Sequence, residues 1–259
     1  MENIRFNIED AIGSITLHRP QVYNSFNRQM ALEVQKALDL CRDDPSVRAI
    51  YLTGSGKAFC AGQDLQEVSD FENSPSFTTI LGEHYNPIIQ RLRSIEKPIV
   101  CAVNGVAAGA GANIAFACDI TVAAESAAFI QAFSKIGLIP DSGGTFILPR
   151  LVGWQKAAAL MMLGEKVAAK EAEAMGMIYK TLPDEGFAAS AYHIAQTLAQ
   201  MPTKGLAYTK HLLNQSLIND LESQLREEDS YQTLAGNTYD YKEGVKAFLE
   251  KRKPVFKGE

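Results

Sequence analysis

Several features that would assign this chain to a common class are scarce or missing. Lys and Arg residues number 25 against 30 Asp and Glu, so the formal net charge is −5 and no basic surface for nucleic acid is expected. No apolar run approaches the ~18 residues of a membrane span. The charged N-terminal residues 1–20 also lack the apolar stretch of a signal peptide. We therefore expect a cytoplasmic protein that binds neither nucleic acid nor membrane.

Cysteine and histidine are equally sparse. The four cysteines are Cys41, Cys60, Cys101 and Cys118. They are scattered, have no CxxC spacing and have apolar neighbours, which favours buried, reduced thiols. The four histidines are His18, His84, His193 and His211. We expect structural or surface positions for them, and because no His, Cys and Asp residues have metal-ligand spacing, we expect no metal.

The 259 residues, 46% of them hydrophobic, are enough for one large domain or one domain with a helical appendage. Runs rich in β-branched residues predict strands at Ile12–His18, Val47–Gly54, Pro98–Gly105 and Asp119–Glu125. Between the first two, one helical face carries Met30, Val34, Ala37, Leu38 and Cys41. After about Trp154 the pattern is almost wholly helical. The sequence therefore predicts an α/β core of stacked βαβ units with a C-terminal helical region.

Two segments rich in glycine and alanine follow predicted strands: Gly54–Leu65 (GSGKAFCAGQDL) and Asn104–Ile120 (NGVAAGAGANIAFACDI). Small residues allow backbones to approach closely, and such loops can direct backbone amides at an oxyanion. Tight packing of a strand against a helix would explain the same composition. Neither segment has the phosphate-loop or dinucleotide fingerprint, which disfavours both of those readings.

A third segment, GLIPDSGGT (Gly137–Thr145), places Asp141 between a proline and two glycines, where a helix is expected to begin. An aspartate at a helix N-cap accepts hydrogen bonds from unpaired amides and complements the helix dipole. The alternative is an acid directed at a substrate. The segment alone favours the cap.

Four segments together resemble the enoyl-CoA hydratase/isomerase (crotonase) superfamily: residues 58–65, 104–120, 133–153 and 243–259. The resemblance extends over nearly the whole chain. It implies an α/β crotonase (ClpP-like) spiral of ββα units over residues 1–200 and a C-terminal helical trimerisation region over residues 201–259. It also implies a homotrimer or hexamer, with association with a related hydratase as a further option.

Within this family, CAVNGVAAGAGA, AFSKIGLIPDSGGT and YDYKEGVKAFL are most similar to the branch that isomerises ring-1,2-epoxyphenylacetyl-CoA in bacterial phenylacetate breakdown. The resemblance implies that the backbone amides of Gln63 and Ala110 hold the thioester oxygen of an acyl-CoA substrate. The residues it assigns to CoA or substrate binding are Ala61, Gln63, Asp64, Leu65, Gly109, Phe248 and Lys251. Coenzyme A is then part of the substrate, and no separate cofactor is expected.

One departure from the family concerns the CoA phosphates. Many relatives have a basic residue in the stretch where this chain has Gln21 and Val22. The residues that hold the phosphates therefore stay open, with Arg19 as a substitute. Asp64, next to the expected thioester site, is expected to fix its own loop by hydrogen bonds.

The more informative departures concern the acids. Hydratases of the family use two glutamates to position and deprotonate water, and the matching positions here are Asn113 and Phe133. Neither can act as a general base, so hydration is disfavoured. A different pattern in the family places one catalytic acid at the position of Asp141. One carboxylate is enough for an isomerase, because it can take a proton from C2 of the thioester and return it to another carbon.

The sequence thus predicts an acyl-CoA isomerase that converts ring-1,2-epoxyphenylacetyl-CoA to the oxepin-CoA, with Asp141 as the catalytic residue. The alternatives are a Δ3,Δ2-enoyl-CoA isomerase of linear acyl-CoAs, a hydratase-like enzyme, and a non-catalytic acyl-CoA-binding or RNA-binding member. The acyl group is not fixed, because the walls of its pocket are expected from the segment Val68–Ile89.

Overall fold

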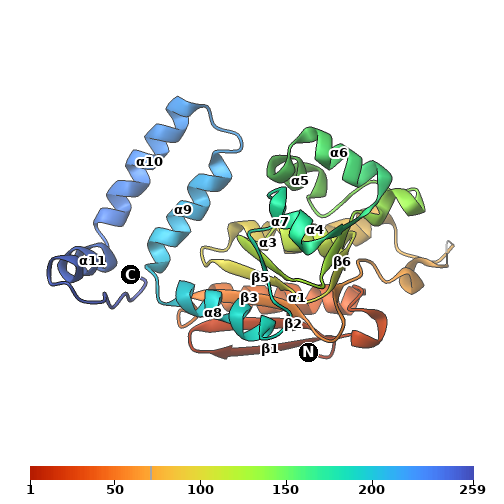
Figure 1. The fold of residues 1–259 in the computed structure, drawn as a ribbon, viewed down its shortest axis with the longest axis horizontal. Coiled ribbons are helices and arrows are strands. Elements are labelled where there is room, and N and C mark those ends of the chain that lie inside the picture. The colour runs from red at the N-terminus through yellow and green to blue at the C-terminus, as the bar shows by residue number, and fades with distance from the viewer. Residues whose placement is uncertain (71) are drawn as a thin grey trace.

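The computed structural model describes residues 1–70 and 72–259, and two β-sheets form its core (Figure 1). The larger sheet has the strand order β1-β2-β3-β5-β7-β10, and the smaller has the order β4-β6-β8-β9. The larger sheet consists of β1 (Ile4–Glu9), β2 (Ile12–Leu17), β3 (Ala49–Gly54), β5 (Ile99–Val103), β7 (Ile120–Ala124) and β10 (Lys180–Leu182). The smaller consists of β4 (Ala58–Cys60), β6 (Val106–Ala108), β8 (Ala128–Ile130) and β9 (Lys166–Ala168). Only the pairs β1–β2 and β8–β9 are antiparallel among the described strands.

The chain repeats one unit as it winds through the two sheets. A strand of the larger sheet is followed by a short strand of the smaller sheet and then by a helix. The three repeats begin with β3, β5 and β7, and their short strands are β4, β6 and β8. The predicted ββα spiral is therefore confirmed.

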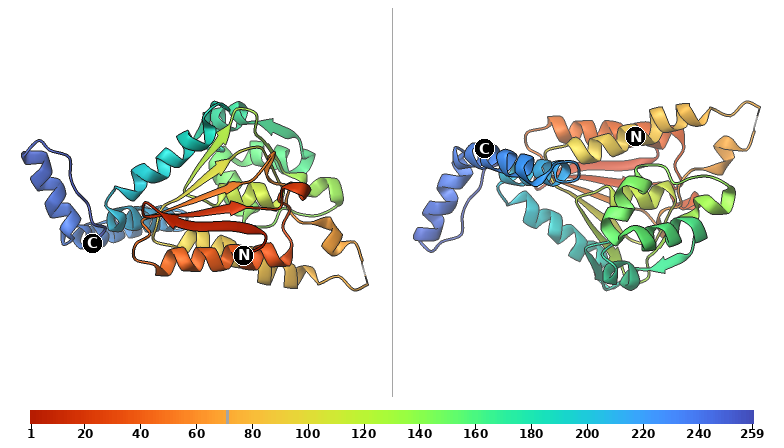
Figure 2. Two further views of the ribbon diagram at one scale, coloured as in Figure 1. Left: turned by 90° about the horizontal axis from the view of Figure 1, so that it is seen from below. Right: turned by 90° about the horizontal axis from the view of Figure 1, so that it is seen from above.

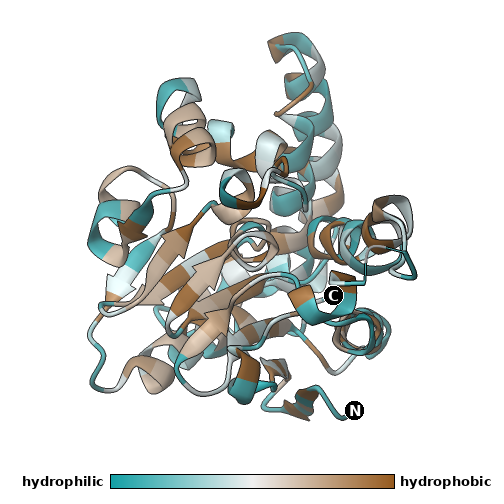
Figure 3. Ribbon diagram, turned by 90° about the vertical axis from the view of Figure 1, so that its right-hand side faces the viewer, coloured by the Kyte–Doolittle hydropathy of each residue, from teal (hydrophilic) through white to brown (hydrophobic). Residues whose placement is uncertain are grey.

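Burial accounts for the strands that the sequence predicted. Every residue of β5 (IVCAV) is buried, as expected for a parallel strand covered on both faces. Helix α1 (Arg28–Asp43) buries the predicted apolar face against the sheet. Asn27 caps this helix by accepting a hydrogen bond of 2.8 Å from the Met30 amide. Figure 3 shows the resulting pattern, with the strands mostly brown and the surrounding helices mixed in colour.

The structure corrects two expectations. The glycine-rich segments are not loops throughout, because each contains a three-residue strand, β4 or β6. The region after Trp154 is not wholly helical, because β9 and β10 interrupt it. Strands of three residues carry too little periodicity to be recognised in a sequence. They form because neighbouring strands supply their hydrogen-bond partners.

Eleven segments of the described chain are α-helical. Besides α1 they are α2 (Phe77–Thr79), α3 (Asn86–Ser94), α4 (Ala110–Phe116), α5 (Gly144–Val152), α6 (Trp154–Leu163), α7 (Ala169–Ala174), α8 (Phe187–Ala199), α9 (Thr203–Gln215), α10 (Leu221–Gly236) and α11 (Tyr239–Leu249). A π-helical turn, η3 (Ile80–Tyr85), joins α2 to α3. Three short 3₁₀ helices are η1 (Pro20–Val22), η2 (Leu65–Val68) and η4 (Ala132–Ile136).

The last three helices project from the core as a limb (Figures 1 and 2). Helix α9 is fixed to the core by Lys210, whose buried ammonium group donates to the Asp119 carboxylate at 2.8 Å and to the Leu92 carbonyl at 2.7 Å. Helix α8 ends at Ala199 and α9 begins at Thr203, and the division of the chain at residue 200 into two regions stays a prediction. Among the described helices, none combines the length and apolarity that a membrane crossing requires. The trimerisation role of this region stays a prediction.

All four cysteines are buried and free, as the sequence predicted. Burial raises the pKa of the Cys41 and Cys60 thiols to about 12. Both thiols therefore stay protonated at neutral pH, and thiolate chemistry is not expected from them.

Candidate active site

The backbone around Gln63 is arranged so that its amide points away from the neighbouring strand segment. Phe26 forms an isolated parallel bridge with Gln63: the Phe26 amide donates to the Gly62 carbonyl at 2.7 Å, and the Asp64 amide donates to the Phe26 carbonyl at 2.8 Å. In a parallel bridge of this kind, the amide of the middle residue faces the other side. Within residues 1–70 and 72–259, the Gln63 backbone amide donates to no acceptor.

The second amide lies at the start of α4. Gly109 precedes this helix with a φ of +53°, and its own amide donates to the Ile130 carbonyl of β8 at 2.9 Å. Ala110 is the first residue of the helix, so its amide is one of those that the helix cannot satisfy internally.

The two turns meet at Gly62, which has a φ of +93°. A methyl group on Gly62 would lie 3.0 Å from the Ala108 carbonyl oxygen and 3.6 Å from the Ala110 nitrogen. The structure thus brings the predicted oxyanion residues Gln63 and Ala110 to one place.

Asp141 does not cap the helix that follows it, contrary to one of the two roles considered for it. The N-cap of α5 is Gly143, which has a φ of +71° and no side-chain cap. The Asp141 carbonyl accepts a hydrogen bond of 2.8 Å from the Gly144 amide, and its carboxylate accepts one of 2.8 Å from the Ser142 hydroxyl. The Asp141 carboxylate therefore does not cap the N-terminus of α5.

Asn113 links the turn that carries Asp141 to α4. Its side-chain amide donates to the Asp141 carbonyl at 2.9 Å, and its oxygen accepts from the Gln131 side chain at 2.8 Å. Because Asn113 lies three residues after Ala110, both are on the same face of α4. The backbone of Asp141 is therefore held one helical turn from Ala110. Asn113, which the resemblance matched to a hydratase glutamate, makes a backbone contact here.

Phe133 closes the site with an apolar wall. Its buried ring lies 3.7 Å from the position that a methyl group on Gly109 would take. The residue that the resemblance matched to the second hydratase acid is thus a ring beside the Gly109 turn. Burial raises the pKa of the Asp141 carboxyl, and the hydrogen bond from Ser142 opposes part of that rise.

Tyr85 is a site residue that the sequence analysis missed. Its hydroxyl donates to the side-chain oxygen of Gln63 at 2.7 Å, and its side chain is buried. The sequence assigned the whole segment Val68–Ile89 to pocket walls and named only His84 within it, as a structural or surface residue. No signal in the sequence pointed to this hydroxyl.

Asp64 fixes its own loop, as expected. Its carboxylate accepts from the Gln66 amide at 3.1 Å and pairs with the Arg19 guanidinium at 2.9 Å. Arg19 also donates to the Ser25 carbonyl at 2.6 Å. These contacts correct the suggestion that Arg19 replaces the basic residue near the CoA phosphates, because its charge is used inside the protein. The CoA-binding role of Asp64 stays a prediction.

The remaining CoA-binding candidates divide into two groups. Ala61 and Leu65 are exposed beside the Gln63 turn, a position that agrees with the CoA-binding role implied by the resemblance. Phe248 and Lys251 are exposed at the end of α11, which lies on the far side of the molecule from α4 (Figure 1). A single chain therefore does not bring Phe248 and Lys251 to the site around Asp141.

The histidines are not part of the described acid-base machinery. His18 contacts the side chains of Arg5 and Ser55 at 3.0 Å each. His84 is buried, and burial lowers its pKa. Among the described residues, no histidine side chain forms a hydrogen bond with Asp141 or Gln63.

Two turns that place amides together, a nearby carboxylate and a spiral of ββα units define a protein class. The family model described as enoyl-CoA hydratase/isomerase matches residues 7–259. The chain belongs to the enoyl-CoA hydratase/isomerase family.

Individual relatives agree with this assignment. The chain is 45% identical to the 1,2-epoxyphenylacetyl-CoA isomerase of Escherichia coli, covering 100% of this chain and 99% of that protein. It is also 45% identical to a Rhodobacter capsulatus protein named "Probable enoyl-CoA hydratase", covering 98% of each. The crystal structure of an enoyl-CoA hydratase from Bacillus anthracis superposes with a TM-score of 0.92 at 30% identity, covering 100% of both chains.

Replacing Asp141 with Asn is expected to leave the protein at least as stable as the wild type at pH 7. Burial raises the pKa of the Asp141 carboxyl in the folded state, so folding favours the protonated form. Stability from this group is complete at low pH and is lost as the pH rises through the folded-state pKa. The melting temperature of Asp141→Asn relative to wild type should therefore be highest at pH 7 and should fall toward pH 4.

Asp43→Asn is the matched control, because the ion pair with Arg42 lowers the pKa of Asp43. The melting temperature of Asp43→Asn relative to wild type should be slightly lower at pH 7 than toward pH 4, the opposite trend. A melting temperature for Asp141→Asn that is several degrees below wild type at pH 7 would contradict the expectation.

Proposed function

We propose that this protein is an isomerase of CoA thioesters that uses Asp141 as its only proton carrier, with ring-1,2-epoxyphenylacetyl-CoA as its substrate. The observation that carries the proposal is the composition of the site. Gly62, next to Gln63, lies against the backbone of Ala108 and Ala110, and Asn113 ties the backbone of Asp141 to the same helix. The sequence resemblance matches Asn113 and Phe133 to the two hydratase acids, which supports a site with Asp141 as its one acid. The relative from Escherichia coli that is named for this isomerisation supports the choice of substrate.

The two amides would act on the thioester oxygen. As the proton leaves C2, negative charge develops on this oxygen, and the amides of Gln63 and Ala110 are placed to donate to it. A donor of this kind is typically worth about 3 kcal/mol in the transition state of acyl chemistry. The amides therefore lower the barrier to enolate formation without taking part in proton transfer.

Asp141 would carry the proton. Burial raises the pKa of its carboxyl, which makes the carboxylate a stronger base than an exposed aspartate. The same carboxyl can then return the proton, because a protonated acid in an apolar site is not strongly disfavoured. The wall formed by Phe133 would limit access of water during this interval.

For the ring epoxide, the bond changes balance without a co-reactant. The carbon–carbon bond shared by the epoxide and the six-membered ring opens, which gives the seven-membered oxepin. The electron pair of the broken C2–H bond forms the exocyclic double bond next to the thioester, and the ring double bonds shift. The proton held by Asp141 is delivered to a ring carbon.

Alternative activities require the same family site but differ in the acyl group or the acid. A linear 3-enoyl-CoA would need the same amides and the same carboxylate to become the 2-enoyl isomer. A hydratase would need a base that activates water, and neither Asn113 nor Phe133 supplies one. Within the described chain, the retained carboxylate and the acidic composition disfavour a non-catalytic or RNA-binding role.

We also propose a cytoplasmic homotrimer or hexamer that associates through the C-terminal limb. Large apolar side chains are exposed on its three helices and on the turn between α9 and α10, and single exposed residues of this kind become significant where they gather. They include Leu213, Ile218, Leu221, Leu225, Leu234, Phe248 and Leu249. In an assembly, Phe248 and Lys251 would then reach the CoA of a neighbouring subunit.

Purified protein should isomerise ring-1,2-epoxyphenylacetyl-CoA faster than it isomerises linear 3-enoyl-CoAs, and should hydrate crotonyl-CoA only negligibly. The physical reason is the absence of a second base in the site. Turnover of the three substrates at matched concentrations tests this order. Crotonyl-CoA hydration as fast as isomerisation would refute the isomerase assignment, and preference for linear chains would refute the substrate.

Asp141→Asn is expected to lose turnover by about 10²–10⁴-fold, the range typical of removing a general base. Affinity for the CoA thioester should persist, because the amides of Gln63 and Ala110 are unchanged. Stopped assays and isothermal titration with a non-reacting thioester measure the two properties, with Asp43→Asn as the control that retains both. Turnover of Asp141→Asn close to wild type would remove Asp141 from the mechanism.

A further inference from the structure

A proline sits inside a helix next to the active site. Residues Phe77–Ser94 form one continuous helical segment made of α2, η3 and α3, and Pro87 is the second residue of α3. Proline has no amide to donate to the carbonyl four residues earlier, and its ring crowds that carbonyl. The helix widens at this point, so that the Asn86 amide donates to the Leu81 carbonyl, five residues earlier. The π turn thus has an identifiable cause in the sequence.

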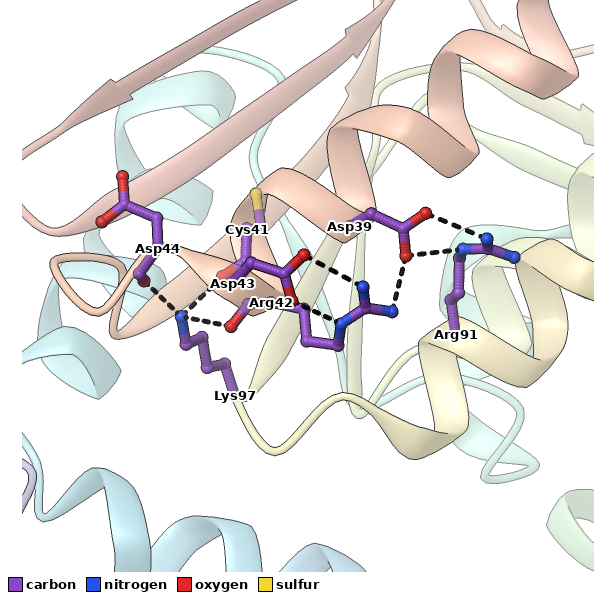
Figure 4. A network of polar contacts seen from close by, with 7 residues as sticks. All are labelled: Asp39, Cys41, Arg42, Asp43, Asp44, Arg91 and Lys97. Carbon is purple, nitrogen blue, oxygen red and sulfur yellow. Dashed lines mark hydrogen bonds and ion pairs between the residues drawn. The ribbon is translucent and has the colours of Figure 1, made fainter.

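The widened turn is satisfied by a neighbouring helix. The Glu83 carbonyl, which Pro87 cannot serve, accepts a hydrogen bond of 2.7 Å from the side-chain amide of Gln35 on α1. The two helices are also held together by a two-point ion pair, in which the Arg91 guanidinium donates to the Asp39 carboxylate at 2.9 Å twice (Figure 4). The π turn is therefore fixed relative to α1.

Tyr85 is the last residue of the π turn, so the π turn determines where its side chain lies. Its buried ring packs beside Phe26, with the ring centres 5.8 Å apart. Its hydroxyl donates to the side-chain oxygen of Gln63 at 2.7 Å. The backbone of Phe26 also forms hydrogen bonds to Gly62 and Asp64, the residues on either side of Gln63. The turn that carries Gln63 is thus held twice: Tyr85 contacts the Gln63 side chain, and Phe26 contacts the backbone of the turn.

The other end of the Gln63 side chain is anchored as well. Its nitrogen lies 3.4 Å from the Glu67 carboxylate, and that carboxylate accepts from the Arg28 amide at 3.0 and 3.1 Å. Arg28 is the first residue of α1. The Gln63 side chain therefore connects the π turn to the start of the helix that holds the π turn in place.

We propose that Tyr85 is a positioning residue of the oxyanion hole, which acts by holding the Gln63 side chain and thereby fixing the direction of the Gln63 backbone amide. The inference rests on the proposed function for its turnover readout only. An oxyanion donor has to be placed accurately, and a displacement of about 1 Å can cost about 10²-fold in rate. In this proposal the Gln63 backbone amide is the hydrogen-bond donor, and the Gln63 side chain sets the direction of that amide.

The test compares Tyr85→Phe, Gln63→Met and the double variant with wild type. Each single variant removes one side of the hydrogen bond and leaves the Gln63 backbone amide in the chain. Tyr51→Phe is the control, because Tyr51 is also a buried tyrosine and packs against Tyr192 away from the site. Thermal unfolding of all variants separates losses of folding from losses of alignment.

The first readout does not depend on turnover. A cinnamoyl-CoA thioester with a para-dimethylamino group absorbs at longer wavelength when donors polarise its carbonyl. Binding to wild type and to Tyr51→Phe should give the same red shift. Tyr85→Phe and Gln63→Met should give a clearly smaller shift, because the Gln63 amide is no longer aligned.

The second readout is steady-state kinetics with the substrate that wild type prefers. Tyr85→Phe is expected to lose about 10- to 100-fold in kcat, with KM changed by no more than about threefold. The double variant should be no slower than the slower single variant, since both changes break one hydrogen bond. Tyr51→Phe should keep the wild-type kcat.

A red shift and a kcat for Tyr85→Phe equal to those of Tyr51→Phe would overturn the proposal, as would multiplicative losses in the double variant. A wild type that converts neither the ring epoxide nor a 3-enoyl-CoA would refute the proposed function instead. In that case the red shift of the bound thioester still decides the role of Tyr85.

Discussion

The close approach of two backbone turns is the constraint on which the active site depends. The turn after β4 carries Gln63, and the turn after β6 carries Ala110, and they touch where only a hydrogen atom fits. A methyl group on Gly111 would lie 2.6 Å from the Cys60 carbonyl oxygen, and one on Gly62 would lie 3.0 Å from that of Ala108. Glycine at these positions lets two amides converge, and the repeated ββα unit brings both turns to the same edge of the smaller sheet.

The acid is placed by the same framework. Asn113 extends from α4 to the backbone carbonyl of Asp141, which ties the turn carrying Asp141 to the helix that begins at Ala110. Gly144 is also constrained by this contact, because a methyl group there would lie 2.7 Å from the side-chain carbon of the Asn113 amide. In the proposed mechanism, Asn113, which the resemblance matches to a hydratase acid, holds the backbone of the single acid. Phe133, matched to the second hydratase acid, supplies an apolar wall.

The sequence predicted those parts of the molecule whose signal is local and strong. Strands such as β3 and β5 are long, β-branched and fully or largely buried, and α1 has a clear apolar face. The three-residue strands were not predicted, because their hydrogen bonds depend on partners far along the chain. Asp141 was ambiguous for a similar reason: a turn that precedes a helix suggests a cap, and only the structure shows that Gly143 takes that place. Tyr85 was missed because its position results from Pro87 and from a contact with Gln35 on another helix.

The central claim is that one half-buried carboxyl, that of Asp141, both removes the proton and returns it. Ring-1,2-epoxyphenylacetyl-CoA that carries deuterium on C2 of the acyl group tests this most directly when it is converted in ordinary water. The position of the label in the oxepin product is read by NMR and mass spectrometry. The account predicts that a measurable share of the deuterium appears on the ring carbon that receives the proton, because in this mechanism Asp141 returns the label before it exchanges with water. A product with only solvent hydrogen at that carbon would contradict it.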